Sequence, residues 1–561
     1  MAERPRNAYT RALGLVTRAL ERLDERYQLA LGWALGHRRA LIGVILLLVA
    51  SAAALVPLIG SEFFPPSDES QFIIRIRAPV GTRVEETERT VARMEEIIRS
   101  SLEPGELNAV VSTVGVPTGR SGVFSQNTGP HAAQLQVYLN TPERRARNDR
   151  EIVAAVRPRL AAQFPGTTMQ VVFGGIVSRV LNTGSQSAVE VEQLGYDLKA
   201  AQATAQEVAR VMQEVHGIAD VFISREENYP QFDIVVDREK AATAGLSQRD
   251  IAQAALFSLN SNVSVNPAIY TDPRTGNQYN MVVQLDEPFR SAAEDLNRLF
   301  VIGDGGRPVL LGSVAEVRQG TGPVMLERKY QQRIVKINAN PAGRDLGAIS
   351  GELDERFRNM ALPPGFTVQL GGQTVQQREA FSSLKFTSLL ALMLVYMVMA
   401  SQFKSLLDPL IIMFSVPLGM IGVIWALFLT NTTLNVTSFM GIIMMVGIVV
   451  SNGVLLVEYI NELRRHGLGL HEAVMRAGRT RLRPIIMTSL TTVVGLIPMA
   501  LGIDVGSEAN APLARAVIGG LTISTMLTLV LIPTLYVIIE ERFPRRVPAL
   551  EGAPVLQGDM A

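Results

Sequence analysis

Six long apolar segments constrain this chain more than any other feature of its sequence. A helix that crosses about 30 Å of hydrocarbon needs roughly 20 apolar residues, because each residue advances about 1.5 Å. The first segment, residues 40–60, contains no charge at all. The others follow in quick succession in the C-terminal third, at residues 386–401, 406–430, 434–459, 484–503 and 516–539. The sequence therefore predicts an integral membrane protein with six transmembrane helices.

Basic residues are concentrated on one side of these segments. Arg38 and Arg39 precede the first segment, further arginines separate the fourth from the fifth, and others follow the sixth. The short connections on the other side carry only Asp504, Glu508 and Arg515. Because basic loops stay in the cytoplasm, we expect both termini to be cytoplasmic. The long stretch between the first two segments is then outside.

The residues that flank the membrane segments have different characters. Residues 1–39 alternate apolar and basic positions at helical spacing, which is typical of an amphipathic helix on the inner membrane face. A soluble linker helix is the alternative. The first apolar segment is too long, and too far from the N-terminus, for a cleaved signal peptide. Residues 541–561 are expected to form a cytoplasmic tail.

The composition of the 561 residues excludes several classes of function. The net charge of +1 gives no support for nucleic acid binding. The absence of cysteine excludes disulfides, thiolate metal sites and cysteine catalysis. The five histidines lack a metal-ligand spacing, and the chain has no phosphate-binding loop or nucleophile elbow. We therefore expect neither an enzyme nor a cofactor nor a metal site.

Residues 61–380 have the pattern of an α+β domain. The stretch 61–175 is expected to have the order β-α-β-β-α-β of a ferredoxin-like, split βαβ unit. Its expected strands lie at 72–78, 109–116, 133–139 and 168–173, and its expected helices at 84–101 and 149–164. The predicted fold is therefore an α-helical membrane domain of six spans carrying an α+β domain of βαβ units.

A second unit of the same kind is expected to be interrupted. Its first part is predicted at 176–220 and its second at 313–380, leading into the second membrane segment. The insertion between them, residues 221–312, has a strand of its own at 231–236. Weak internal duplication of this sort is typical of transporters.

Four segments carry a resemblance to a known family, and together they extend it from Tyr27 to Phe543. They are PQFDIVVDREKAATAGLSQRDI (230–251), SVPLGMIGVI (415–424), GIVVSNGVLLVEYINELRRHG (447–467) and RLRPIIMTSLTTVVGLIPMA (481–500). They resemble the C-terminal half of resistance-nodulation-division (RND) permeases of the hydrophobe/amphiphile efflux branch.

This resemblance implies a set of expectations. Full-length members have two such halves and twelve spans, form trimers and export amphiphiles as protons flow inward across the bacterial inner membrane. They work with a periplasmic adaptor and an outer-membrane channel. By resemblance, 61–175 and the interrupted unit form the porter in the periplasm, 221–312 forms the docking or funnel subdomain, and 381–540 contains spans two to six.

The resemblance also identifies candidate residues for a proton relay. In the family an acidic pair in the N-terminal half carries protons, and neither that half nor another mid-membrane carboxylate is found here. Asp408 begins one span and Glu458 ends another, so both are expected at the interface. The usual lysine is replaced by Ser451, and Asn452 follows it.

Two further family positions lie in the next helix, where the threonine matches Thr488 and the arginine matches Arg481. The two helices run in opposite directions. Glu458 lies seven residues after Ser451, and Arg481 lies seven residues before Thr488, which is about 10 Å along each helix. We therefore expect a polar layer of Ser451, Asn452 and Thr488 that faces the missing acidic pair. A Glu458–Arg481 contact is expected to close it. In the alternative, Ser and Thr merely satisfy backbone carbonyls.

The candidate substrate path is the loop at 116–129. It resembles the family's switch loop between drug pockets, with Val116, Val123 and Phe124 as the apolar contacts. A surface loop without a ligand role is the alternative. Methionines of the outer domain would suit copper(I) or silver(I), but half of them fall within predicted helices, where core packing is commoner.

Two functions from different classes remain open. The first is half of a proton-driven efflux pump that needs a second chain with the N-terminal half. The second is a non-transporting membrane scaffold or export accessory, or a truncated gene product, that keeps the fold without proton coupling. Serine at the usual lysine position favours the second slightly, and heavy-metal efflux is a weaker third.

Overall fold

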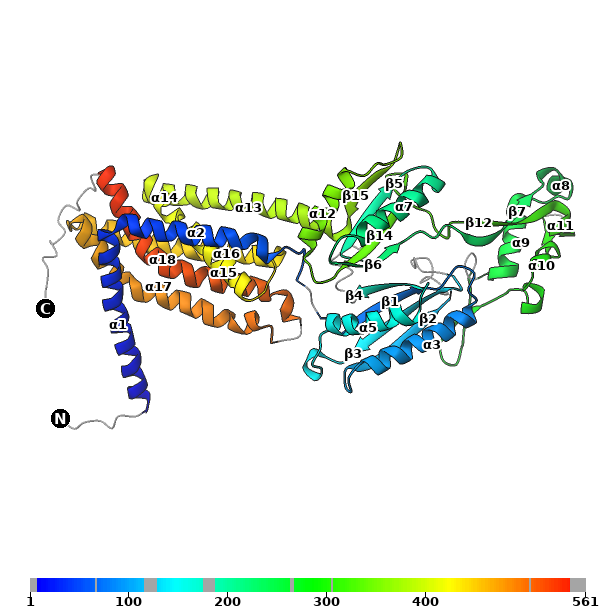
Figure 1. Cartoon of the computed structure of the whole chain (residues 1–561), viewed down its shortest axis with the longest axis horizontal. Helices are drawn as coiled ribbons and strands as arrows, with labels where there is room; N and C mark the ends of the chain where they lie inside the picture. The colour runs from blue at the N-terminus through cyan, green and yellow to red at the C-terminus, as the bar shows by residue number, and fades with distance from the viewer. Residues whose placement is uncertain are drawn as a thin grey trace. The chain divides into compact units, whose positions relative to one another are not determined.

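The computed structural model describes residues 8–65, 68–115, 129–174, 187–262, 267–303, 306–503 and 506–544. The chain divides into two compact units. The helical unit contains residues 1–69, 341–355 and 371–561, and the α/β unit contains residues 70–340 and 356–370. Figure 1 labels the helices and strands of both units.

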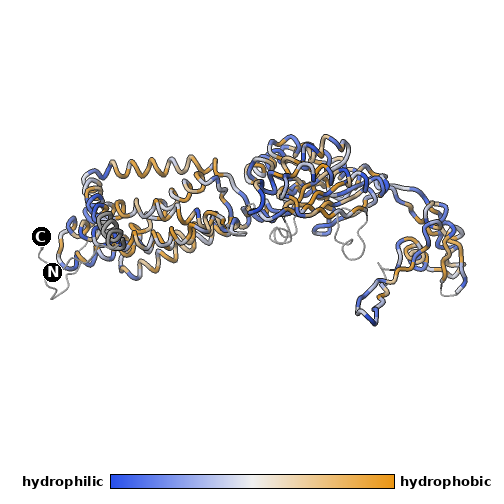
Figure 2. Tube along the Cα trace, turned by 90° about the horizontal axis from the view of Figure 1, so that it is seen from below, coloured by the Kyte–Doolittle hydropathy of each residue, from blue (hydrophilic) through white to orange (hydrophobic). Residues whose placement is uncertain are grey.

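The helical unit contains the six predicted spans. The described residues include six helices long and apolar enough to cross a membrane, which confirms the predicted number. Figure 2 shows the apolar residues running along these helices. With the lead-in helix α1, the elements are α1 (Ala8–Gly36), α2 (Arg38–Ile59), α13 (Gly372–Phe403), α14 (Leu407–Met413), α15 (Ser415–Leu429), α16 (Val436–Arg465), α17 (Leu470–Leu501) and α18 (Ala511–Arg542).

Several of these helices are longer than their apolar segments. Helix α13 begins at Gly372 rather than at residue 386, and α17 begins at Leu470 rather than at residue 484. The added turns are polar or charged, so hydropathy does not detect them, although helical hydrogen bonding continues through them. The predicted segments therefore delimit the apolar part of each helix and not the helix itself.

The third span is interrupted where α14 ends and α15 begins. Phe414 separates the two helices. Pro417 lies in the first turn of α15 and has no N–H to donate to the carbonyl of Met413, one turn earlier. The proline thus accounts for a break that hydropathy alone did not predict.

Helix α18 is at the centre of the bundle. It packs against α15, α16 and α17. More than half of the residues in its most apolar stretch are buried, whereas only 6% of those in the corresponding stretch of α13 are buried. Glycines allow the closest approach, because a methyl group on Gly519 would overlap Ala426 and the carbonyl of Gly422. Small residues of this kind are the usual contact surface between membrane helices.

The first sheet of the α/β unit has the predicted sequence of elements. These are β1 (Gln71–Arg77), α3 (Val84–Ser101), β2 (Leu107–Val114), β3 (Ala132–Leu139), α5 (Asp149–Gln163) and β4 (Thr168–Phe173). The strands are antiparallel in the order β2-β3-β1-β4. Ile74 pairs with Leu135 on one side and with Val171 on the other, and these side chains join Met94 of α3 and Ile152 of α5 in one core.

An ion pair stabilises one edge of this sheet. Glu106, 2% exposed, accepts hydrogen bonds from Arg147 Nε at 2.9 Å and Nη2 at 2.5 Å. The Arg147 hydrogen bond holds the pKa of Glu106 below its ordinary value. Because the folded-state pKa is lowered, this stabilisation is present above the unfolded pKa of about 4.3 and is lost as the pH falls through the folded value.

Glu106→Gln is therefore expected to destabilise the α/β unit at pH 7 by about 1 to 2 kcal/mol, since it removes one partner of a pair that is only partly exposed. Hydrogen–deuterium exchange of β2 in the full chain measures the loss of protection. Glu96→Gln, an exposed glutamate of α3, is the matched control. Equal protection in the two variants at pH 7 would contradict the assignment.

The second sheet is built from distant parts of the chain. It contains β5 (Val189–Leu194), β6 (Ile218–Ile223), β13 (Glu327–Lys329), β14 (Gln332–Pro341) and β15 (Thr367–Gly371). The order is β13-β14-β5-β15, and β6 also pairs with β14. The helices that follow β5 and β14 in the chain are α7 (Leu198–Gln213) and α12 (Leu346–Arg358).

The insertion joins this sheet through a two-stranded ribbon. Strand β7 (Tyr229–Val236) pairs antiparallel with β12 (Ala315–Gly322), from Tyr229 opposite Gly322 to Val236 opposite Ala315. Between them lie α8 (Arg238–Thr243), α9 (Gln248–Asn260), β8 (Ala268–Thr271), β9 (Gln278–Met281), α10 (Ala293–Asn297), β10 (Phe300–Ile302), β11 (Pro308–Leu310) and α11 (Leu311–Val314).

The predicted bounds of the insertion, 221–312, differ from the observed ones. Residue 221 lies inside β6, which belongs to the second sheet, and residue 312 lies before β12. Strand β6 was missed because its partner β14 is more than a hundred residues away. A local pattern does not reveal such a pairing.

Candidate functional site

A buried polar layer connects three membrane helices near the middle of the bundle. Asn452 Nδ2 of α16 donates to Ser489 Oγ of α17 at 3.3 Å. The Ser489 hydroxyl is 2.9 Å from Thr525 Oγ1 of α18, which donates to the carbonyl of Leu521 at 2.6 Å. All three polar side chains are buried, so the layer satisfies its own hydrogen bonds inside the bundle.

The structure places Ser451 and Thr488 outside this layer. Both are exposed in this chain, because each lies one residue, or about 100° around its helix, from a buried member of the layer. Thr488 donates to the carbonyl of Ile485 at 3.0 Å. This bond agrees with the alternative in which Ser and Thr satisfy backbone carbonyls of their own helix. Asn452 therefore points inward and Ser451 points away from the chain's own core. Ser489 and Thr525, which complete the layer, were not predicted.

The expected Glu458–Arg481 contact is wrong. No ion pair joins them in the part of the chain that the structure describes. Glu458 is exposed, and the Arg481 guanidinium lies over the ring of Tyr459, 4.5 Å from its centroid. The seven-residue spacings correctly place the two residues at one level. They do not fix the direction around the helix, and that direction brings Tyr459 rather than Glu458 to Arg481.

A second polar cluster was missed by the sequence analysis. Asp408, expected at the interface, is 4% exposed, and its Oδ2 accepts from Asn461 Nδ2 at 3.3 Å. Tyr536 donates to Asn461 Oδ1 at 2.6 Å and accepts from Arg464 Nη1 at 2.9 Å, and Arg464 pairs with Glu540 at 2.7 Å. The cluster joins α14, α16 and α18 at one end of the bundle.

Helical spacing could have identified this cluster. Asn461 and Arg464 are three residues apart on α16, while Tyr536 and Glu540 are four apart on α18. Such pairs face the same direction. Polar residues that share a face near the end of an apolar helix indicate a polar contact with a neighbouring helix.

The lead-in helix α1 is attached to the bundle by its C-terminal half. Tyr27 donates from its hydroxyl to the carbonyl of Leu529 at 2.9 Å, and Arg483 of α17 pairs with Asp24 at 2.7 Å. Leu31 is completely buried. Figure 1 shows α1 crossing the end of the bundle at a large angle to the spans.

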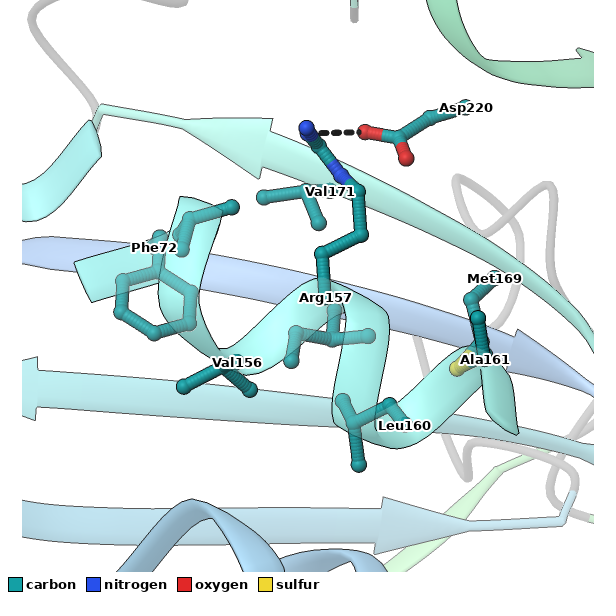
Figure 3. Close-up of a pocket in the computed structure, with 10 residues that line it drawn as sticks. Phe72, Val156, Arg157, Leu160, Ala161, Met169, Val171 and Asp220 are labelled. Atoms are coloured by element: carbon teal, nitrogen blue, oxygen red, sulfur yellow. Dashed lines mark hydrogen bonds and ion pairs between the residues drawn. The ribbon is translucent and has the colours of Figure 1, made fainter. Parts of the chain in front are cut away.

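The α/β unit contains an apolar pocket of about 200 Å³ between α5 and the first sheet. Phe72, Val156, Leu160 and Val171 line it, and Figure 3 shows them around the aliphatic stem of Arg157. The guanidinium of Arg157 reaches out to Asp220, at 2.7 Å. The ion pair thus lies at the rim of a pocket whose wall is otherwise hydrocarbon.

A buried junction connects the first sheet to the residues around β6. Arg77 donates to the carbonyls of Ile223 and Ser224 at 3.1 Å each, and its guanidinium lies 4.2 Å from the ring centroid of Phe222. Burial lowers the pKa of Arg77, although the nearby Glu226 opposes the shift. His131, one of the five scattered histidines, lies 2.8 Å from Glu226 Oε1.

The remaining candidates give little further information. Val116, Val123 and Phe124 lie outside the described residues. Met94 and Met212 are fully buried in helices, as expected for core packing. Among the described residues, no three His, Asp or Glu side chains are grouped so that they could hold a metal ion.

These features define a multi-span membrane protein whose chain also folds into a mixed α/β unit. The chain belongs to the AcrB/AcrD/AcrF family, which it matches over residues 1–540, and its relatives are RND permeases. This family consists of efflux transporters rather than enzymes.

Three relatives illustrate the range of the family. The chain is 29% identical over 504 residues to the cobalt-zinc-cadmium resistance protein CzcA of Cupriavidus metallidurans, a match covering 88% of this chain and 46% of that protein. It is 27% identical over 535 residues to the multidrug resistance protein MdtC of Escherichia coli, covering 94% and 50%. The solved structure of a heavy metal efflux pump matches with a TM-score of 0.76 and 29% identity, over 93% of this chain and 53% of that one.

The chain therefore spans about half the length of the curated relatives it matches. These relatives are named for metal resistance and for multidrug resistance, so membership of the family does not decide between the two substrate classes.

Proposed function

We propose that this chain is the C-terminal half of a proton-motive-force-driven RND efflux transporter. It exports amphiphilic or hydrophobic small molecules together with a complementary N-terminal half that supplies the acidic pair. The assembly is a trimer in the bacterial inner membrane, with the α/β unit in the periplasm and both termini in the cytoplasm. A periplasmic adaptor and an outer-membrane channel complete it.

The observation that carries this proposal is an exposed face of small and polar residues on α16 and α17. Gly447 and Ser451 lie one turn apart on α16, and Thr488 and Gly495 lie two turns apart on α17. Nothing lies within 4 Å of a Cβ built on either glycine. Small residues on membrane helices favour close contact with another helix, and no described helix of this chain covers these positions. The face therefore suits a second set of spans.

The proton relay of the proposal uses this same face. Ser451 and Thr488 face the acidic pair of the second half, and Asn452 holds α16 to α17 behind them through Ser489. Arg481, held over Tyr459, supplies a positive charge at the level below. Glu458, exposed at that same level, is open to a partner on the second half.

The α/β unit supplies the porter in this proposal. The antiparallel order β2-β3-β1-β4, with a helix after β1 and another after β3, supports a ferredoxin-like assignment for residues 61–175. The interrupted second sheet forms the other porter subdomain. The insertion carried by β7 and β12 forms the docking subdomain, and Val116, Val123 and Phe124 belong to the substrate path.

Amphiphile export is preferred to metal export because of the side chains present. The apolar pocket beneath Arg157 suits hydrocarbon, and the described residues contain no grouped metal ligands. The names of CzcA and of the solved heavy metal pump favour metal export as a second candidate. A non-transporting accessory remains the alternative if Ser451 does not support proton coupling.

Export assays in cells that lack their own RND pumps test the proposal. The chain is expressed alone and together with an N-terminal RND half that carries the acidic pair. Export of an amphiphilic dye is expected only with both halves, and a protonophore should abolish it. Thr488→Ala is expected to reduce export about a hundredfold, the lower end of the range for loss of a proton-transfer group.

Thr480→Ala is the matched control, because Thr480 is an exposed threonine of α17 that also bonds a carbonyl of its own helix. It should leave export unchanged. Export by the chain alone would refute the two-half assembly. Cobalt or zinc tolerance without dye export would favour the metal candidate, and no gain in either assay would favour the accessory.

A further inference from the structure

A groove of about 500 Å³ runs along the outside of the helical unit between α1, α17 and α18. Helix α1 contributes Leu23, Arg26 and Tyr27, and the two spans contribute mostly leucine, isoleucine, valine and methionine. Ser489 and Thr525, two members of the buried polar layer, also line it. The groove is apolar along its length and has an arginine on the helix that crosses one end.

The length of the groove matches one leaflet of a bilayer. Its lining on α17 runs from Leu482 to Val493, a rise of about 16 Å. The hydrocarbon core is about 30 Å thick. The groove begins beside the Arg483–Asp24 ion pair, where the apolar part of α17 starts, and it ends near the middle of that apolar part. This is the depth of a single acyl chain.

At the α1 end of the groove, the exposed charged side chains on one side of helix α1 are all positive. Arg22 and Arg26 are one turn apart on α1, next to the groove-lining Leu23, and both are exposed. Glu21 and Glu25 lie about 100° around the same helix from Arg22 and Arg26, on the side away from the groove-lining Leu23 and Tyr27. Arg26 makes no ion pair with any described residue. Asp24, two positions earlier, faces away from Arg26 around the helix and pairs with Arg483.

We propose that this groove binds an anionic phospholipid of the leaflet on the α1 side. One acyl chain lies between α17 and α18, and the phosphate group lies beside Arg26 and Arg22. Phosphate oxygens suit guanidinium groups, and basic residues beside a membrane attract anionic lipids. This site requires only that the helical unit lies in a membrane, and it does not depend on export.

The groove stays accessible when a second set of spans covers the exposed face. Leu482, Ile486 and Val493 lie roughly opposite Thr488 around α17. The proposed acyl chain would cover the Ser489 and Thr525 hydroxyls from outside. The lipid would thereby keep water from the polar layer that Asn452 closes from within.

Spin-label quenching in nanodiscs tests the proposal with the full chain. The chain has no cysteine, so Leu490→Cys places a single bimane fluorophore in the groove. Chain-labelled doxyl phosphatidylglycerol or phosphatidylcholine is added at the same low mole fraction to otherwise identical bilayers. Since one basic residue near the surface is worth about fivefold in anionic-lipid affinity, phosphatidylglycerol is expected to be enriched at least about fivefold at the fluorophore.

Arg22→Gln combined with Arg26→Gln should remove this preference, while Arg39→Gln, an exposed arginine of α2, should retain it. Thr522→Phe, which fills the groove and leaves the charges, should remove it by a second route. Equal quenching by both lipids would show unselective lipid contact and overturn the proposal. An absence of quenching by either lipid would show that protein occupies the groove, which would also overturn it.

Discussion

Arg464→Leu is expected to lower the free energy of unfolding of the helical unit by about 3 kcal/mol. The substitution removes the cation that pairs with Glu540, which is 3% exposed, and leaves that buried carboxylate without this partner. It also removes the donor to the Tyr536 hydroxyl. Denaturant unfolding of the purified full chain in mild detergent, followed by circular dichroism, measures the change.

Arg465→Leu is the matched control, because Arg465 is the next residue of the same helix and is exposed. It should change stability by less than about 0.5 kcal/mol. A double variant, Arg464→Leu with Glu540→Leu, should recover part of the loss, because it removes both charges together. If Arg464→Leu and Arg465→Leu unfold at the same denaturant concentration, the cluster does not hold α16 to α18.

Gly519→Leu is expected to prevent α15 and α18 from packing. The free energy of unfolding of the helical unit should fall by at least about 3 kcal/mol. A side chain at this position overlaps Ala426 and the backbone of Gly422, so no rotamer change relieves the clash and the helices must separate. The expected result is loss of the monodisperse peak in size-exclusion chromatography after detergent extraction. Gly422→Leu should give the same result from the other side of the contact.

Gly495→Leu provides the contrast that makes this test informative. Gly495 is also a glycine inside a span, but a Cβ there meets no atom within 4 Å. The isolated chain should therefore tolerate the substitution, which should instead weaken co-purification with an N-terminal half. If Gly495→Leu aggregates as Gly519→Leu does, intrinsic helix or insertion effects account for both results, and the close contact does not.

The larger elements of the fold were predicted well from the sequence, and their limits less well. The spans were found because an uncharged run of about 20 apolar residues is typical of a transmembrane helix and rare in other structures. The polar beginnings of α13 and α17 were missed, because they leave the apolar region while the helix continues. Strand β6 was missed because its hydrogen bonds go to β14, far along the chain.

The candidate site shows the same limit at the level of single side chains. Spacing along two antiparallel helices gives depth, so Ser451 and Thr488 were assigned to one level. It does not give the direction around each helix, which decides that Asn452 points to Ser489 and that Arg481 meets Tyr459. Helical spacing marks the polar faces of α16 and α18 that form the Asp408 cluster, but it does not show that these faces meet each other and α14.

The β7–β12 ribbon has a consequence for how this protein can change over time. The chain enters and leaves the insertion through paired strands, with Tyr229 opposite Gly322. The insertion has its own apolar core, centred on Leu246, Ile251 and Leu311, to which the ribbon contributes Ala315 and Val236. The insertion is therefore a cassette with two adjacent ends. It could be exchanged between relatives, or replaced by a short turn, without altering the hydrogen bonding of either sheet beneath it.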